Sequence, residues 1–303
     1  MPPAIVAAIN NREALVALES SVLAQGLPAP LNLETARECE RAVRREGATP
    51  VTIGVVDGVP LLGLSDREME IFASGRAPDG SRIEKVSLNN LAAQALGGRW
   101  GATTVAATMQ IACGGGLKVF ATGGIGGVHR GVSDTFDISA DLGEMALSNV
   151  AVVTAGAKAI LDLSLTVEKL ETLGVPVVGY CTDDFPAFYS RSSGLKCPMR
   201  VDRAEDMARL MRAKWALGLS GGIVVANPIP AEYEIAAYEI TPLIEKAVAE
   251  ARAEKIDGRE VTPFLLARLA RATSGRSLAA NIELVKNNAL VAARIAKAYM
   301  EIA

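Results

Sequence analysis

The sequence predicts an α/β protein, a three-layer α/β/α sandwich around a mainly parallel, mixed sheet, followed by a helical C-terminal extension. Short runs rich in Val and Ile recur along the chain, and longer segments with helical periodicity lie between them. Near-continuous apolar runs are typical of strands covered on both faces, and their alternation with helices favours parallel pairing. From Glu239 onward the pattern is helical almost throughout.

The predicted strands are short and contain few polar residues, as expected for a sheet that is covered on both faces. They are Leu15–Leu18, Thr52–Val56, Val119–Ala121, Val150–Thr154, Pro176–Gly179 and Ile223–Ala226. Between them, apolar residues recur with the spacing of one helix face. The predicted helices are Leu33–Glu46, Thr103–Cys113, Asp137–Ser148 and Ala204–Leu217.

The C-terminal region contains signals for the starts of three helices. Two pairs, Thr241-Pro242 and Thr262-Pro263, each place a capping residue before a proline at the first helical position. Ser277 is expected to cap the last helix, Leu278–Tyr299.

The composition is that of a globular chain with an aliphatic core. Of 303 residues, 50% are hydrophobic and 21% are charged, which excludes a disordered chain and a bundle of membrane helices. No linker-like or low-complexity stretch divides the chain. We therefore expect a single domain over residues 1–303, with residues 239–303 as its helical extension.

Charge and residue usage exclude several classes of function. The 31 Lys and Arg residues and 34 Asp and Glu residues give a net charge of −3, so a nucleic-acid polymer is not an expected partner. One histidine, His129, and four scattered cysteines cannot build a His-rich or Cys-rich zinc site. The N-terminal residues lack a basic region and a clear cleavage site, so we expect a soluble, cytoplasmic protein without a membrane partner.

The segment Lys118–Gly131 is the most distinctive part of the chain. A predicted strand runs directly into four glycines, whose backbone N–H groups can approach an anion closely. The segment is not a dinucleotide-binding fingerprint, because His129 stands at the third glycine position, and no Gly-Lys-Ser/Thr follows to make a P-loop. A phosphate or substrate cradle and an ordinary glycine-rich turn both fit the spacing.

Three aspartates, Asp134, Asp137 and Asp141, follow at helical spacing and are predicted to share one face near a helix start. Carboxylates in a first turn commonly cap free N–H groups and complement the helix dipole. The neighbouring glycines would also bring these carboxylates beside a bound phosphate, where oxygen ligands suit Mg²⁺ or Mn²⁺. Both roles are open.

Two residues beside predicted strands are candidates for catalysis. Lys158 follows Val150–Thr154 among small and aliphatic side chains, a setting that favours a nucleophilic amine. A solvent-facing lysine in the first turn of a helix is the more frequent case. Glu19 follows Leu15–Leu18 at a strand end where open α/β sheets bind ligands, so it could be a general acid or a local cap.

Eight segments of the chain match one known family. They are Ala17–Ser20, Gly101–Thr108, Lys118–Gly131, Thr135–Leu142, Ala155–Lys158, Gly222–Pro230, Thr262–Leu266 and Ser277–Asn281. Together they resemble the pseudouridine-5′-phosphate glycosidases, a family also named after indigoidine synthase A. The resemblance covers nearly the whole chain, from Ala14 to Tyr299.

The resemblance implies reversible cleavage of pseudouridine 5′-phosphate to uracil and ribose 5-phosphate. It also implies one divalent metal ion per subunit, usually Mn²⁺, with Mg²⁺ or another divalent ion as the alternative. The bond to be cleaved is carbon–carbon, so protonating a heteroatom leaving group, as ordinary glycosidases do, is insufficient. The resemblance makes Lys158 the nucleophile that forms a covalent adduct with the ring-opened sugar, and Glu19 the proton donor.

Further site residues are also implied by the resemblance alone. Asp137 is the metal-linked aspartate, although Asp141 is left open as the direct ligand. The family is typically homotrimeric, so a homotrimer that binds a small-molecule substrate is expected. The implied substrate contacts are Lys85, Val105, His129, Ser139, Ala140, Asp141 and Asn281.

The chain departs from the family pattern at two places. Many relatives have His-Gly at the position of Gln25-Gly26, and a charged stretch where this chain reads Leu88–Leu91. Both departures affect the expected substrate more than the chemistry. Two alternatives are therefore kept: the same lysine chemistry on another C-nucleotide or phosphosugar, as in pigment or antibiotic metabolism, and a non-catalytic binding protein. The presence of Glu19 and Lys158 argues against the second.

Overall fold

The computed structural model describes residues 1–254, 256 and 261–302. Twelve strands are found in this part of the chain. They are β1 (Leu15–Glu19), β2 (Thr49–Val56), β3 (Val59–Leu62), β4 (Glu84–Val86), β5 (Gly101–Thr103), β6 (Val119–Ala121), β7 (Val128–His129), β8 (Ala151–Thr154), β9 (Leu161–Asp162), β10 (Val177–Tyr180), β11 (Met199–Val201) and β12 (Ile223–Ala226).

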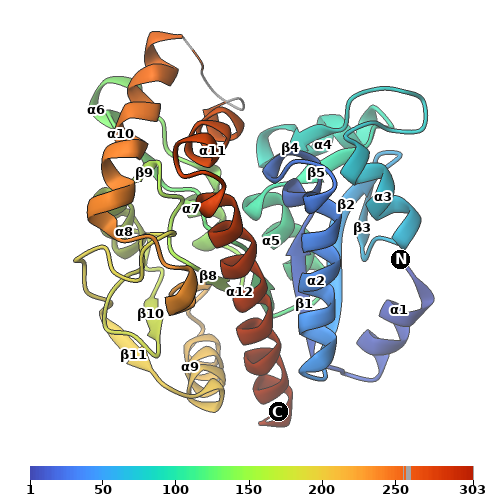
Figure 1. The fold of residues 1–303 in the computed structure, drawn as a ribbon. Helices are drawn as coiled ribbons and strands as arrows, with labels where there is room; N and C mark the ends of the chain where they lie inside the picture. Colours follow the sequence, from blue (N-terminus) through green and yellow to red (C-terminus); the bar gives the residue numbers. More distant parts are fainter. Residues whose placement is uncertain (255, 257–260, 303) are drawn as a thin grey trace.

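One mixed sheet forms the centre of the molecule (Figure 1). Its order is β11-β10-β12-β8-β6-β1-β2-β5-β4, and β3 pairs with β2 beside this path. β2 is antiparallel to β3 and β5, whereas the other neighbouring strands are parallel. β7 and β9 form a separate two-stranded ladder. The predicted mainly parallel, mixed sheet is confirmed.

Helices cover both faces of this sheet. They are α1 (Pro3–Asn10), α2 (Leu31–Arg45), α3 (Asp66–Ser74), α4 (Leu88–Leu96), α5 (Val105–Gly114), α6 (Val132–Thr135), α7 (Ala140–Met145), α8 (Leu163–Thr172), α9 (Ala204–Ala216), α10 (Ala237–Ala253), α11 (Val261–Ala272) and α12 (Arg276–Glu301). A π-helical turn, η1 (Val22–Gly26), and a 3₁₀ turn, η2 (Ala231–Tyr233), complete the described elements.

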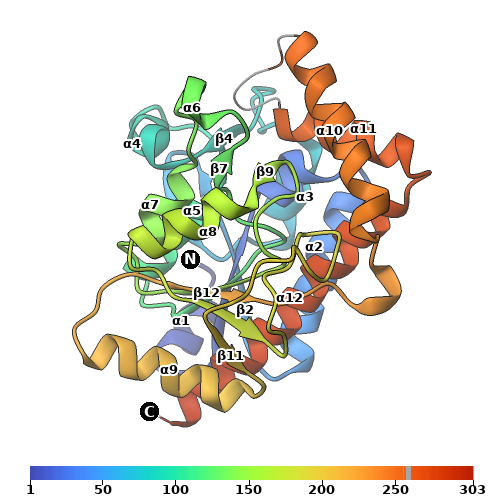
Figure 2. The same cartoon turned by 90° about the vertical axis from the view of Figure 1, so that its left-hand side faces the viewer.

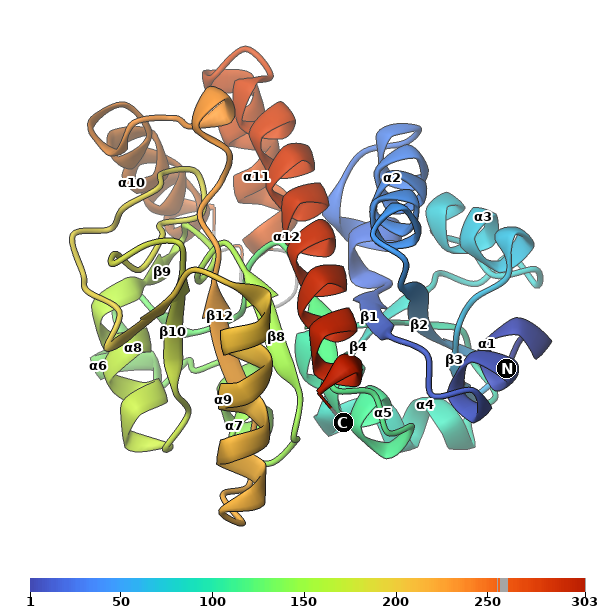
Figure 3. The same ribbon diagram turned by 90° about the horizontal axis from the view of Figure 1, so that it is seen from below.

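The two layers follow from the alternation of side chains along the strands. Val16 and Leu18 of β1 pack in the core under α2, α9 and α12, which lie side by side in Figure 3. Ala17 packs on the opposite side, together with Met109 of α5 and Leu142 of α7. Figure 2 shows α5 and α7 next to each other on that face. The predicted three-layer α/β/α sandwich is thus confirmed.

All six predicted strands coincide with β1, β2, β6, β8, β10 and β12 to within three residues at each end. The prediction missed the remaining strands, which are two to four residues long. One of them, Gly101–Thr103, lies where a helix was expected to begin at Thr103. Thr104 caps α5 instead, because its hydroxyl accepts the N–H of Ala107.

The predicted helix Asp137–Ser148 is wrong in its first turn. α7 begins at Ala140, because the side chain of Ser139 caps it by accepting the N–H of Asp141. Asp137 lies between α6 and α7, outside both helices, and its carbonyl accepts the N–H of His129. The predicted helix face shared by Asp134, Asp137 and Asp141 therefore does not form.

The helical C-terminal extension is confirmed, but its predicted starts are wrong. α10 begins at Ala237, which leaves Pro242 inside the helix, and α11 begins at Val261, one residue before Thr262. α12 begins at Arg276, so Ser277 is not its cap. Gly275 occupies the cap position without a side-chain hydrogen bond, and the hydroxyl of Thr273 accepts the N–H of Ser277 at 3.0 Å. None of the helices in the described part of the chain is long and apolar enough to cross a bilayer.

Candidate active site

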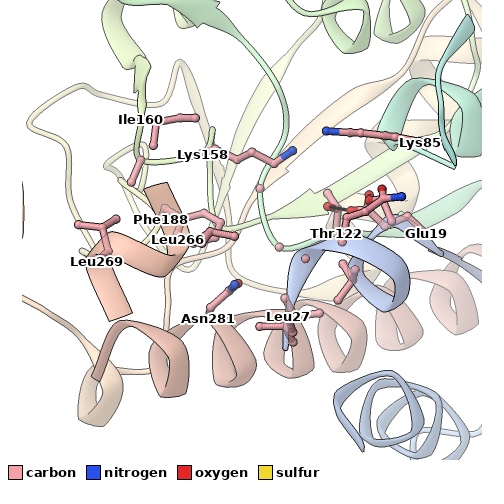
Figure 4. A pocket seen from close by; sticks show the side chains of 18 of the residues that line it. Glu19, Leu27, Lys85, Thr122, Lys158, Ile160, Phe188, Leu266, Leu269 and Asn281 are labelled. Carbon is pink, nitrogen blue, oxygen red and sulfur yellow. Dashed lines mark hydrogen bonds between the residues drawn. The ribbon is translucent and has the colours of Figure 1, made fainter. Parts of the chain in front are cut away.

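A pocket of about 230 Å³ opens at the carboxyl ends of β1, β6 and β8 (Figure 4). Glu19 ends β1, Thr122 follows β6 directly, and Lys158 follows β8 in the next loop. Because these strands are parallel neighbours, their carboxyl ends bring the three residues to one edge of the sheet, where α/β proteins bind ligands. Further walls come from η1, the strand β4 and the helices α11 and α12.

Glu19 is held by two hydroxyl groups. Ser21 donates to Oε2 and Thr122 donates to Oε1, and only 9% of the residue is exposed. These two hydrogen bonds fix the orientation of the Glu19 carboxylate, which forms part of the pocket wall. The local turn contact that the sequence allowed is therefore present, and it coexists with a place in the pocket.

Lys158 lies in a loop and not in the first turn of a helix. Its backbone N–H donates to the carbonyl of Ile125 at 3.0 Å, which ties the loop to the glycine segment. Gly156 allows this loop to pass close to the backbone of Pro186. It has φ +92°, and a Cβ atom there would lie 2.1 Å from the carbonyl oxygen of Pro186. Neighbouring backbone thus sets the direction in which Lys158 enters the pocket.

Two ammonium groups face each other across the pocket. Figure 4 shows the side chain of Lys85, from the edge strand β4, pointing toward that of Lys158. Two cations on opposite walls favour an anionic ligand between them. Asn281 of α12 supplies a neutral amide on a third wall, close to Gly123, where a Cβ atom would lie 3.6 Å from Asn281 Oδ1.

The pocket also has an apolar side. Side chains from the loop after β8, the loop between β10 and β11 and helix α11 lie together there in Figure 4. Such a surface suits the face of a flat ring. These residues are Ile160, Phe188, Leu266 and Leu269.

The glycine segment is shaped by close packing. A Cβ atom at Gly124 would lie 2.7 Å from the ring of Phe188, and one at Gly126 would lie 2.1 Å from the hydroxyl oxygen of Ser139. Asp141, which is 4% exposed, accepts the N–H of Gly126 at 2.8 Å and the N–H of Ala106 at 2.9 Å. Both carboxylate oxygens of Asp141 are thus used to hold backbone in place.

The predicted site residues do not all reach the pocket. Glu19, Lys85, Lys158 and Asn281 lie in its walls. The other predicted residues lie outside these walls, and Val105 among them is buried in the core at the start of α5. These others are Val105, His129, Asp137, Ser139, Ala140 and Asp141.

His129 and Asp137 form a small polar pair next to the glycine segment. Nδ1 of His129 lies 3.5 Å from Oδ2 of Asp137, whose side chain is 55% exposed. Burial lowers the pKa of His129, and the charges of Lys158 and Lys85 lower it further, whereas Asp137 opposes the shift. The two lysines are therefore close enough for their charges to act on the pair.

Whether the site suits a divalent ion depends on the side chains next to the glycine segment, and on Asp137 in particular. Within the described residues, no cluster of three or more His, Cys, Asp or Glu side chains could enclose a metal. Mg²⁺, however, is usually bound by one or two carboxylates together with water and substrate phosphate, a mode that oxygen ligands also offer to Mn²⁺. The half-exposed carboxylate of Asp137 offers oxygen ligands of this kind.

Several pocket residues were not anticipated from the sequence. Ser21 and Thr122 could have been suspected, because they stand next to Glu19 and to the glycine segment. Phe188 carries no signal in the sequence, since only tertiary structure brings its loop to the pocket. The same holds for Leu269 of α11, whereas Leu266 ends the segment Thr262–Leu266, which carries part of the family resemblance.

Comparison with known families shows which family the chain belongs to. Residues 4–298 match the family described as "Indigoidine synthase A like protein". The chain belongs to this family. Its membership confirms the resemblance deduced from the sequence.

Relatives within the family are similar over their full length. The pseudouridine-5′-phosphate glycosidase of Escherichia coli (strain K12) is 52% identical over 99% of this chain and 95% of its own. The protein of the same name from Paracoccus denitrificans (strain Pd 1222) is 53% identical over 98% of this chain and 99% of its own.

Two solved structures have the same fold. The prealnumycin C-glycosynthase AlnA, in complex with ribulose 5-phosphate, superposes with a TM-score of 0.90 at 38% identity, over 99% of this chain and 96% of its own. An indigoidine synthase A-like protein from Thermotoga maritima gives a TM-score of 0.85 at 37% identity, over 94% of this chain and 92% of its own.

Proposed function

We propose that this protein is an enzyme that reversibly cleaves the carbon–carbon glycosidic bond of pseudouridine 5′-phosphate, yielding uracil and ribose 5-phosphate, in pseudouridine catabolism. The names of full-length relatives at 52% and 53% identity support this activity. The observation that carries it is the meeting of Glu19, Lys85 and Lys158 in one pocket. A carboxyl group, an anion-binding cation and a nucleophilic amine are the groups that this reaction needs.

Lys158 is proposed as the nucleophile. Its amine bonds to the anomeric carbon as the ring C–O bond breaks, and the ring oxygen takes a proton from Glu19. The ammonium of the adduct returns a proton to Glu19, which passes it to the uracil carbon. The bond between the two carbons then breaks, uracil leaves and a protonated imine remains on Lys158. Water hydrolyses this imine to ribose 5-phosphate and the free amine, and the proton released returns to Glu19, which restores both groups.

Lys85 is proposed to bind the phosphate group, and Asn281 to hydrogen-bond an edge of the uracil ring. For the divalent ion, Mn²⁺ or Mg²⁺, we propose Asp137 as the ligand and not Asp141. Both oxygens of Asp141 accept backbone N–H groups, whereas Asp137 is half-exposed. When bound, such an ion would neutralise charge on the substrate phosphate.

A second substrate class is favoured by one observation. The apolar side of the pocket would also accommodate an aromatic ring other than uracil, and AlnA, at 38% identity, is named a C-glycosynthase. The same lysine chemistry would then act on another C-nucleotide or phosphosugar.

The assay that tests the proposal measures uracil released from pseudouridine 5′-phosphate in the presence of Mn²⁺, beside a panel of other C-nucleotides. Release of uracil by the wild type, and its loss in Lys158→Ala, is expected. If folded, metal-loaded protein released no uracil but cleaved another C-nucleotide, the second class would replace the first.

We further propose a cytoplasmic homotrimer, for which sedimentation should give three times the mass of the chain.

A further inference from the structure

A polar side chain in the pocket wall has no role in the proposed lysine chemistry. Gln25 lies in the π-helical turn η1, which follows Glu19 and forms one wall of the pocket. Single π-helical turns occur frequently at functional sites. Nε2 of Gln25 donates to the carbonyl oxygen of Ile83 at 3.1 Å, in the segment that leads to Lys85.

This hydrogen bond fixes the orientation of the Gln25 amide. Because Nε2 is the atom that donates to the carbonyl of Ile83, the other end of the amide is Oε1, which can only accept. Oε1 is buried and has no hydrogen-bond partner within the part of the chain that the structure describes. Buried acceptors without a partner are uncommon in folded proteins, so each one calls for an explanation.

Because Oε1 can only accept, its missing partner must be a hydrogen-bond donor. Glu19 accepts hydrogen bonds from Ser21 and Thr122, and the side chains of Lys85 and Lys158 point toward each other across the pocket, where they favour an anion. A phosphate dianion offers only acceptors, so it cannot satisfy Oε1 of Gln25. The groups of the proposed substrate that can do so are the ring N–H groups of uracil and the hydroxyl groups of ribose.

We propose that Gln25 determines substrate specificity, because its Oε1 accepts a hydrogen bond from an N–H or O–H group of the substrate. This inference rests on the proposed function. Since Oε1 is covered, substrate entry shifts the side chains around it slightly. A substrate that lacks the matching donor leaves Oε1 buried and unpaired, and it is therefore rejected.

The test compares the wild type with Gln25→Met in the direction of synthesis, from uracil and ribose 5-phosphate. Met keeps the length of the side chain and removes both polar atoms. The measured quantity is kcat/KM for uracil against 1-methyluracil and 3-methyluracil, and for ribose 5-phosphate against its 2-deoxy and 3-deoxy forms. The methylated bases each lack one ring N–H, and the deoxy sugars each lack one hydroxyl, so the panel identifies the donor.

A matched control is available outside the pocket. Nε2 of Gln94 also donates to a backbone carbonyl, that of Trp100, at 2.9 Å, and Gln94 is buried. Gln94→Met therefore removes the same kind of hydrogen bond at a distance from the substrate. It should lower thermal stability about as much as Gln25→Met does, while every substrate preference stays at its wild-type value.

The inference predicts that one preference of the wild type, for the base or sugar that carries the donor, falls by about tenfold or more in Gln25→Met. It is overturned if all rates fall by the same factor, which indicates a structural role, or if no preference changes. A wild type that makes no product from uracil and ribose 5-phosphate refutes the proposed function itself, and the inference with it.

Discussion

Lys158 owes its place in the pocket to small residues around it. Gly156 leaves room for the carbonyl of Pro186, and the backbone of Lys158 is bonded to Ile125. The sequence identified Lys158 through its small and aliphatic neighbours, but spacing alone favoured a place in a helix. The loop follows from the packing of Gly156, which the sequence pattern does not reveal.

Replacing Lys158 with Arg should separate charge from nucleophilicity. Arg keeps a cation opposite Lys85 but cannot form the covalent adduct. We expect kcat to fall by about three orders of magnitude or more while ribose 5-phosphate still binds. Single-turnover rates and calorimetric titration measure the two effects. Activity within tenfold of the wild type would contradict the role given to Lys158.

Replacement by asparagine should have different effects at Asp137 and Asp141, the two aspartates next to the glycine segment. Asp137→Asn should raise the Mn²⁺ concentration needed for half-maximal activity and leave unfolding unchanged, because the residue is half-exposed. Asp141→Asn should destabilise the fold by about 1–3 kcal/mol, because it weakens two charge-assisted bonds to backbone N–H groups. Metal titration and urea unfolding of both variants check this. The reverse pattern would make Asp141 the metal ligand.

At the level of elements, helix α12 is tied to the glycine segment by one buried amide. Asn288 is fully buried, donates to the carbonyl of Thr122 at 2.7 Å and accepts a hydrogen bond from Asn227 at 2.8 Å. Asn288→Leu leaves these partners without a hydrogen bond. We expect a loss of about 2–3 kcal/mol in the free energy of unfolding, measured in urea. A variant as stable as the wild type would show that the amide is not needed.

Helix α7 should show a stability that depends on pH. Burial raises the pKa of Glu144, and a hydrogen bond from Ser148 opposes the shift. An acid with a raised pKa in the folded state destabilises the fold as pH rises above its ordinary value of 4.5. Glu144→Gln should therefore gain stability over the wild type between pH 5 and 8, and no longer do so near pH 3. Thermal melts across this range measure the difference; a constant difference would contradict it.

The elements differ in how well the sequence predicted them. Long apolar strands such as Thr49–Val56 were found because they are buried on both faces. The strand Glu84–Val86, which carries Lys85, was missed because two of its three residues are charged and it contains no apolar run, unlike Val119–Ala121. The Thr-Pro pairs misplaced the helix starts, since tertiary packing extends α10 back to Ala237 and leaves its proline inside.

At the scale of the whole molecule, the site depends on parts of the chain that are distant in sequence. Four residues that line the pocket come from the first strand, an edge strand, a central loop and the last helix. They are Glu19, Lys85, Lys158 and Asn281, respectively. The resemblance to a family could name these four residues. Only the fold shows why they meet: parallel strands end at one edge, and α12 packs against β1 and β6 and reaches the pocket there. The apolar side, with Phe188, is a product of the fold alone.

The proposed covalent bond between Lys158 and the sugar can be tested directly. The protein would be incubated with pseudouridine 5′-phosphate and Mn²⁺, treated with borohydride, and digested for peptide mass spectrometry. We expect uracil release together with a reduced pentose-phosphate adduct on the peptide that contains Lys158, and no adduct in Lys158→Arg. Release of uracil with an unmodified Lys158, or an adduct on Lys85 instead, would contradict it.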